Sequence, residues 1–101
     1  MTVKWFDGKG DIADIIALRK EVFCDEQHYP AELEIDEHDY TDALHLGLYD
    51  DGKLVACGRY VVMPSFAKLG RIAVKKEYRG SGVGSVIMEN LFERAKNDGI
   101  D

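Results

Sequence analysis

Apolar and polar positions alternate or cluster in a way that separates strands from helices along the chain. Apolar stretches of strand length predict β-structure at residues 3–6, 43–49, 54–62 and 67–74. Apolar residues at intervals of three and four predict helices from residue 12 to about 26 and from residue 82 to about 97. The order strand, helix, loop, hairpin, strand, helix predicts an α/β (α+β) fold.

Turn and cap residues fit these boundaries. Asp11 is a good N-cap for the first helix, and Gly99 is the expected C-cap of the second. The Asp51-Gly52 pair between two apolar stretches predicts a hairpin. Residues 28–42 read mostly as loop because Pro30 stops the first helix, with a short helix from Ala31 as an option.

Composition narrows the class of protein. A chain of 101 residues that is 46% hydrophobic and 32% charged predicts one globular domain. We expect a cytoplasmic protein, because no apolar run approaches the roughly 20 residues of a membrane span and the N-terminus lacks a secretory signal. Cys24 and Cys57, without a C-x-x-C motif, are interpreted as reduced core residues.

Charge is segregated along the sequence. Residues 25–42 contain eight acids and no Lys or Arg, whereas the remainder carries a net charge of +2. Residues 68–79 hold a basic cluster of two arginines and three lysines. The two segments are either solvated loops or parts of a site with two ligands, one cationic and one anionic. The overall net charge of −6 disfavours nonspecific nucleic-acid binding.

A glycine-rich turn joins the last predicted strand to the last helix. Its sequence is Arg79-Gly80-Ser81-Gly82-Val83-Gly84. Glycines admit close backbone approach, and the first turn of a helix offers unpaired N–H groups, so the turn is suited to a pyrophosphate. A tight turn that binds nothing is the alternative. The segment has no G-K-[ST] for a P-loop, and Ser85 stands where the dinucleotide fingerprint needs glycine. The match to G-x-G-x-x-A at residues 8–13 is weak, because its strand is short and two acids flank it.

The residues of this turn resemble a known family. Arg79-x-x-Gly82-x-Gly84 resembles the [QR]-x-x-G-x-[GA] signature of the GCN5-related N-acetyltransferases, or GNAT superfamily. Residues 18–39, from Leu18-Arg19 through Glu26-Gln27 to Asp39, resemble its ElaA-type branch. The resemblance covers nearly the whole chain and implies the N-terminal part of the family fold, with a mixed, mainly antiparallel sheet.

The resemblance implies a cofactor and the residues that hold it. Ile72, Ala73 and Val74 would line the pantetheine arm of acetyl-CoA, and the pyrophosphate would be held by Arg79, Gly80, Ser81, Gly82, Val83 and Gly84. The implied reaction is transfer of an acetyl group from acetyl-CoA to a neutral amine, with a general acid protonating the departing thiolate.

The resemblance also implies more chain than is present. Family domains run to about 140–150 residues, within the usual domain range, and continue with a second splayed strand, a helix and a hairpin. We therefore expect residues 1–101 to be a C-terminally incomplete acetyltransferase-like domain whose general acid is not assigned. The strand at 67–74 would keep one edge uncovered. This predicts a homodimer or higher oligomer through that edge, unless acetyl-CoA covers it.

Four residues are candidates for contact with the acceptor, and each has a simpler explanation. Glu26, Glu32 and Asp36 of the acidic segment could bind or deprotonate a cationic acceptor amine, or are surface acids. His45 is a candidate base, or a core histidine. The spacing of His28, Glu32, Asp36 and His38 fits no metal signature, so no metal is expected.

Three functions stay open at this point. The first is an N-acetyltransferase acting on an unknown, cationic amine. The second is a noncatalytic acyl-CoA-binding module, and the third is a structural or dimerisation module whose glycine turn binds nothing. Turnover separates the first from the second, and CoA binding separates the second from the third.

Overall fold

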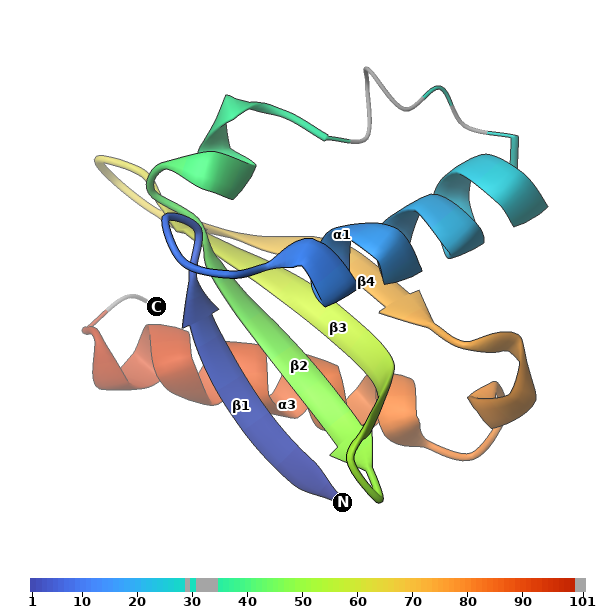
Figure 1. The fold of residues 1–101 in the computed structure, drawn as a ribbon. Coiled ribbons are helices and arrows are strands. Elements are labelled where there is room, and N and C mark those ends of the chain that lie inside the picture. Colours follow the sequence, from blue (N-terminus) through green and yellow to red (C-terminus); the bar gives the residue numbers. More distant parts are fainter. Residues whose placement is uncertain (29, 31–34, 100–101) are drawn as a thin grey trace.

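Strands from both halves of the chain form one antiparallel sheet in the order β1-β2-β3-β4 (Figure 1). The computed structural model describes residues 1–28, 30 and 35–99. The strands are β1 (Thr2–Asp7), β2 (Leu44–Asp50), β3 (Lys53–Val62) and β4 (Ala67–Val74). Every strand end lies within one residue of its predicted position, which confirms the strands and the fold class. The described sheet is antiparallel throughout, so its mixed character stays a prediction.

Helices also form where the periodicity places them. They are α1 (Ala13–Arg19), its π-helical continuation η1 (Lys20–Glu26), the short 3₁₀ segments η2 (Glu37–Tyr40) and η3 (Lys76–Tyr78), and α3 (Val83–Asn97). The short helix predicted from Ala31 falls on residues 31–34, outside the described residues.

Both predicted caps are off by one residue. The N-cap of α1 is Ile12, and Asp11 precedes it, although the Asp11 Oδ1 still accepts a hydrogen bond from the Ala13 amide at 3.2 Å. The C-cap of α3 is Asp98. Gly99 follows it with a φ of +79°, the left-handed conformation that ends many helices.

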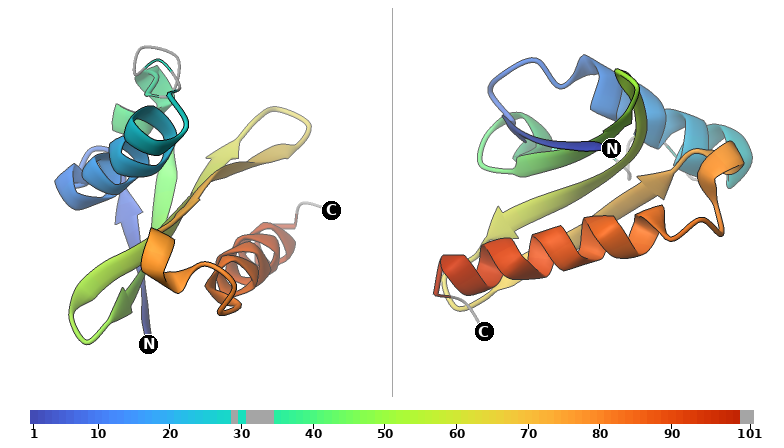
Figure 2. Two further views of the ribbon diagram at one scale, coloured as in Figure 1. Left: turned by 90° about the vertical axis from the view of Figure 1, so that its right-hand side faces the viewer. Right: turned by 90° about the horizontal axis from the view of Figure 1, so that it is seen from below.

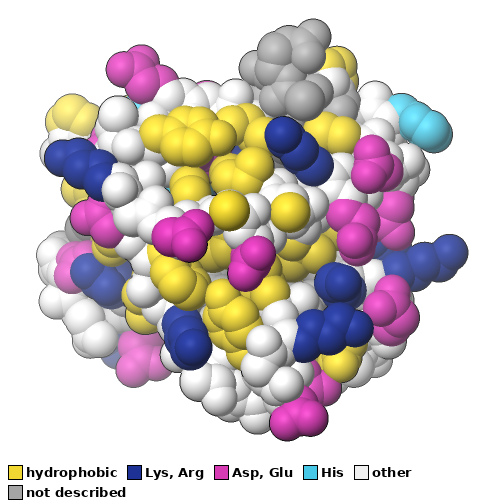
Figure 3. Space-filling model, in the orientation of Figure 1, with side chains coloured by type: hydrophobic (Ala, Val, Ile, Leu, Met, Phe, Trp, Pro, Cys, Tyr) yellow, Lys and Arg dark blue, Asp and Glu magenta, His cyan; other side chains and the backbone are white. Residues whose placement is uncertain are grey.

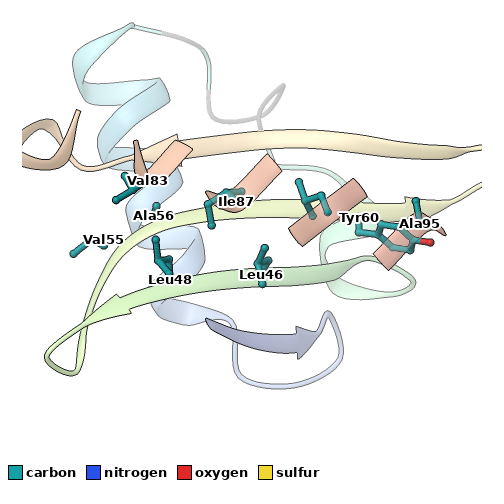
Figure 4. Packing of buried hydrophobic residues seen from close by; sticks show 9 residues of the cluster. Leu46, Leu48, Val55, Ala56, Tyr60, Val83, Ile87 and Ala95 are labelled. Carbon is teal, nitrogen blue, oxygen red and sulfur yellow. The ribbon is translucent and has the colours of Figure 1, made fainter. Parts of the chain in front are cut away.

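The two long helices cover opposite faces of the sheet (Figure 2). Nine buried residues form the core between the sheet and α3, and Figure 4 shows how they interdigitate. Gly58 brings the helix close, because a Cβ there would lie 2.7 Å from Cγ2 of Ile87 and 3.0 Å from Cδ1 of Leu91. The packing thus fixes the axis of α3, and with it the position of the glycine turn.

A second core cluster lies under α1 and η1. It consists of Ile15, Leu18, Val22, Leu54, Cys57 and Ala73. Both cysteines are free thiols, as predicted, but only Cys57 is buried, whereas Cys24 is partly exposed. Within the described residues, no helix is both long and apolar enough to span a membrane.

Candidate functional site

The glycine turn between η3 and α3 has an open, backbone-lined shape. Gly80 and Gly82 have φ values of +83° and +87°, and a Cβ on either would meet nothing within 4 Å. Gly82 is the N-cap of α3, and its carbonyl accepts the first helical hydrogen bond, from Val86, at 3.2 Å. The amides of Val83 and Gly84 precede that bond and belong to the first turn, where N–H groups have no helical acceptor. This turn fits an anionic group that approaches the backbone.

Arg79 stands at the start of this turn and is held in place from two sides. Its Nε donates to the Val74 carbonyl at 3.2 Å. Its guanidinium forms an ion pair with Glu26, at the end of η1. The structure therefore brings together a predicted cofactor-binding residue and a predicted acceptor-binding residue. The Ser81 hydroxyl, in turn, donates to the Tyr78 carbonyl, within the same turn.

The strand β4 leads into the turn and lies at the edge of the sheet. Among the described residues, its only hydrogen-bonded neighbour is β3. Ile72 and Val74 are half-buried against the α3 core, and Ala73 is buried under η1. Because the side chains of these three residues are anchored on the faces of the sheet, their backbone edge is presented for strand-like pairing.

A bulge interrupts β4 just before these residues. Its register with β3 shifts between Cys57 and Arg59, and Arg71 opposite them has a φ of +50°. A non-glycine residue in this region costs about 1–3 kcal/mol and persists only when its surroundings compensate. Bulges redirect side chains, and this one turns Arg71 toward Asp36, whose Oδ2 lies 3.4 Å from an Arg71 Nη.

Asp36 and Asp39 join three arginines into one ion network. Arg19 binds both oxygens of Asp39, at 2.6 and 3.1 Å. Arg59 bridges the two acids, donating at 2.7 Å to Asp36 and at 3.1 Å to Asp39. Arg19 and Asp39 are fully buried, so this network lies partly in the core.

The network determines the charge state of Asp39. Burial alone would raise the pKa of Asp39. The hydrogen bonds from Arg19 and the Asp36 amide, with the charges of Arg19 and Arg59, hold the pKa below its ordinary value of 3.8. Asp39 therefore stays ionised at neutral pH and serves as the anionic centre of the network.

His45 is buried beside this network. It has no exposed surface, and its Nε2 lies 3.0 Å from the Asp39 carbonyl oxygen. Its Nδ1 is the one fully buried side-chain N or O atom of the described residues without a hydrogen-bond partner. Burial lowers the pKa of His45 below 6.5, so the ring is neutral and donates from Nε2 to the carbonyl.

The pH dependence of stability should carry the signature of His45. Its folded pKa is lowered, so the unfolded chain binds the extra proton, and stability falls as pH drops below about 6.5, by at most about 1.4 kcal/mol per pH unit. In urea unfolding between pH 5 and 7, His45→Gln, which keeps a donor for the carbonyl, should be less pH-dependent than the parent. Equal slopes for both proteins would contradict a neutral, buried His45.

The candidate residues thus divide into groups. Glu26 belongs to the glycine turn through Arg79, Asp36 belongs to the arginine network, and His45 is buried below that network. Glu32 lies outside the described residues. In the part of the chain that the structure describes, no three His, Cys, Asp or Glu side chains are grouped as a metal site requires.

Sequence reasoning missed the roles of Arg19 and Asp39. A signal was present, because Arg19 occupies the apolar stripe of α1 together with Ile15, Ile16 and Val22. An arginine at such a position needs a buried acidic partner. The sequence offered eight acids in the following segment without indicating which one is buried.

Comparison with known proteins identifies the family of this chain. The family model for the GNAT family of acetyltransferases matches residues 12–101, so the chain belongs to that family. The Bacillus subtilis protein YjcF, named an uncharacterized N-acetyltransferase, is 43% identical over 88 residues, which are 87% of this chain and 61% of YjcF. The chain thus spans less than two thirds of the length of that relative.

Solved structures show the same fold. An acyl-CoA N-acyltransferase from Pseudomonas aeruginosa is 27% identical, with a TM-score of 0.88 over 99% of this chain and 72% of that one. Escherichia coli ElaA is 25% identical, with a TM-score of 0.84 over 96% of this chain and 70% of that one. The predicted resemblance to the GNAT superfamily is confirmed.

Proposed function

We propose that this protein transfers an acetyl group from acetyl-CoA to an amine, with the acetyl-CoA held along the β4 edge and in the glycine turn. The observation that carries the proposal is the open backbone at Gly80 and Gly82, between η3, which follows the edge strand β4, and the N-terminus of α3. A pyrophosphate needs close backbone approach and positive potential, and the turn supplies both. Family membership supplies the reaction class.

Each part of the site has a distinct task in this proposal. Residues 80–84 bind the pyrophosphate through their backbone, and Arg79 adds a positive charge. The backbone of Ile72, Ala73 and Val74 pairs with the amides of the pantetheine arm. In the reaction, the amine nitrogen forms a bond to the thioester carbonyl carbon, the C–S bond breaks, and the thiolate takes up a proton.

Two tyrosines among the described residues use their hydroxyl groups in hydrogen bonds to aspartates, and this bears on which group could protonate the thiolate. The Tyr60 hydroxyl donates to Asp98 at 2.8 Å, and the Tyr78 hydroxyl donates to Asp50 at 2.7 Å. The pKa of each phenol is raised, by burial and Asp98 for Tyr60 and by the bond to Asp50 for Tyr78. We therefore assign neither as the acid that protonates the thiolate.

The acidic segment (residues 25–42) attracts a cationic amine less strongly than its sequence charge suggests, because several of its acids pair with arginines. Glu26, Asp36 and Asp39 have arginine partners that offset their fields. Acidic and basic side chains are interspersed on the face shown in Figure 3. The attraction of a cationic amine would rest on exposed acids of the segment, such as Asp25 and Glu37. Such a field is screened by salt, so catalytic efficiency should fall as ionic strength rises.

Calorimetric titration with acetyl-CoA, run beside an acetyl-transfer assay over a panel of amines, tests the proposal. Binding with turnover supports an acetyltransferase. Binding without turnover for any amine supports a noncatalytic acyl-CoA module. Absence of acetyl-CoA binding would refute the site itself.

The free edge of β4 leads to a prediction about assembly. We propose that a second copy of the 101-residue chain covers the edge at residues 67–74 when acetyl-CoA does not. Among the described residues, the N–H and C=O groups of β4 that point away from β3 have no partner strand, and such groups template strand pairing. Sedimentation at micromolar concentration should show a dimer or larger species without ligand and a shift toward monomer with acetyl-CoA. A ligand-free monomer would contradict it.

A further inference from the structure

A positively charged cavity adjoins the proposed acetyl-CoA edge. It has a volume of about 290 Å³ and is lined by residues of η2 and of the start of β4. Its charged lining consists of Asp36, Arg59, Lys68 and Arg71, with His38 at the same wall. Three cationic side chains thus face one carboxylate in a space of small-molecule size.

Among the described residues, the charged side chains of the lining sum to +2. Arg19 and Asp39, which adjoin Arg59, offset each other. The pair of His38 with Asp42 adds no more than one negative charge. Glu37 is exposed and is not part of the lining. The described lining, counted with these two pairs, therefore keeps a net charge of at least +1.

The two arginines of the lining are held in place. Asp36 accepts from Arg59 at 2.7 Å, and Arg59 is further fixed by the buried Asp39. The bulge at Arg71 directs this side chain to the same wall, at a cost in backbone strain that its ion pair with Asp36 helps to offset. Lys68 is exposed and adds a third cation to the lining. Preorganised guanidinium groups bind a carboxylate with little further ordering.

We propose that this cavity binds a carboxylate carried by the acceptor amine, so that the acceptor is an amino acid-like zwitterion. The inference rests on the proposed function, because the cavity is lined by residues 68–71 of the same strand whose residues 72–74 would hold acetyl-CoA. An acceptor anchored by its carboxylate at one end of β4 therefore presents its amine toward the acyl group. Such an acceptor has the positively charged amine that the acidic segment predicts, and it also has a carboxylate that binds in the cavity.

Binding of two matched amines to the 101-residue chain tests this proposal without requiring turnover. The probes are 5-aminopentanoate and 5-aminopentanamide, which share the amine and differ in one charge. NMR titration should show the carboxylate compound binding about tenfold tighter, the size of one charge-assisted contact. Shift changes should concentrate at residues 68–71.

Three variants test whether the preference for 5-aminopentanoate over 5-aminopentanamide arises in the cavity. Lys68→Gln, which changes an exposed side chain, should reduce the preference several-fold, and Arg71→Gln should reduce it further. Lys96→Gln removes an exposed charge from the last turn of α3 and should leave it unchanged. Equal binding of the two amines, undetectable binding of the carboxylate compound, or an equal effect of Lys96→Gln would overturn the proposal. So would acetate binding as tightly as 5-aminopentanoate.

Acetyl-CoA titration separates this inference from the proposed function. If the chain prefers the carboxylate compound but does not bind acetyl-CoA, the proposed acetyl-CoA site is refuted. The assignment of the cavity to the acceptor is then refuted as well, and the cavity is only an anion site. Acetyl-CoA binding without carboxylate preference refutes only the acceptor anchor.

Discussion

Replacing Asp39 with alanine should lower the free energy of unfolding by about 3–5 kcal/mol. Asp39 is fully buried and is the carboxylate that Arg19 and Arg59 share. Its removal leaves two guanidinium groups beside a buried void, and the desolvation of Arg19 loses its main compensation. A domain of this size has about 5–15 kcal/mol of stability in total, so the variant should be close to unfolding at moderate temperature. Urea unfolding followed by circular dichroism measures the loss.

Two further variants make this test specific. Glu37→Ala removes an exposed acid from the same segment and should change stability by less than about 0.5 kcal/mol. Arg19→Met in the Asp39→Ala background should recover part of the loss, because it removes one of the buried charges that alanine left behind. An Asp39→Ala variant as stable as Glu37→Ala would show that the network does not hold η2 to the sheet.

The fold could be predicted from the sequence because its signals are local. Each strand is an apolar stretch bounded by turn residues, and this signal holds even for β3, which is buried on both faces. Asp51-Gly52 fixes the register of the hairpin. The glycine turn was equally readable, since all of its chemistry lies in six consecutive residues. Its φ values at Gly80 and Gly82 are those that the pattern requires.

The arginine network could not be predicted because its members meet only through tertiary structure. Asp39 is 20 positions from Arg19 and 20 positions from Arg59 in the sequence. Their arrangement depends on the packing of α1 and on the bulge in β4, neither of which leaves a pattern that singles out Asp39 among its acidic neighbours. The same difficulty applies to Asp36, whose ion pairs with Arg59 and Arg71 also form only through tertiary structure. Its contact with a cationic acceptor stays a prediction.

The ion pair of Arg79 also changes how the acetyl-CoA site is best tested. Arg79→Ala would remove a charge-assisted contact worth about 1.5–3 kcal/mol to the pyrophosphate. It would also break the pair with Glu26 and the hydrogen bond to the Val74 carbonyl, which hold the turn against η1 and β4. A loss of affinity in that variant therefore mixes binding with local structure.

Gly82→Val, compared with a control that carries a similar backbone strain elsewhere, separates the two effects and should reduce acetyl-CoA affinity by at least about tenfold, the equivalent of 1.4 kcal/mol. A valine side chain at this position would project into the space where the pyrophosphate approaches, which is open now. Valine also disfavours the φ of +87°, at a cost of about 1–3 kcal/mol that tends to close the turn. Gly99→Val is the matched control, because Gly99 has a φ of +79° and equal space but lies past the other end of α3. Calorimetry should show parent-like acetyl-CoA affinity for Gly99→Val and a large loss for Gly82→Val at similar stability. Equal affinities in the two variants would exclude the glycine turn as the pyrophosphate site.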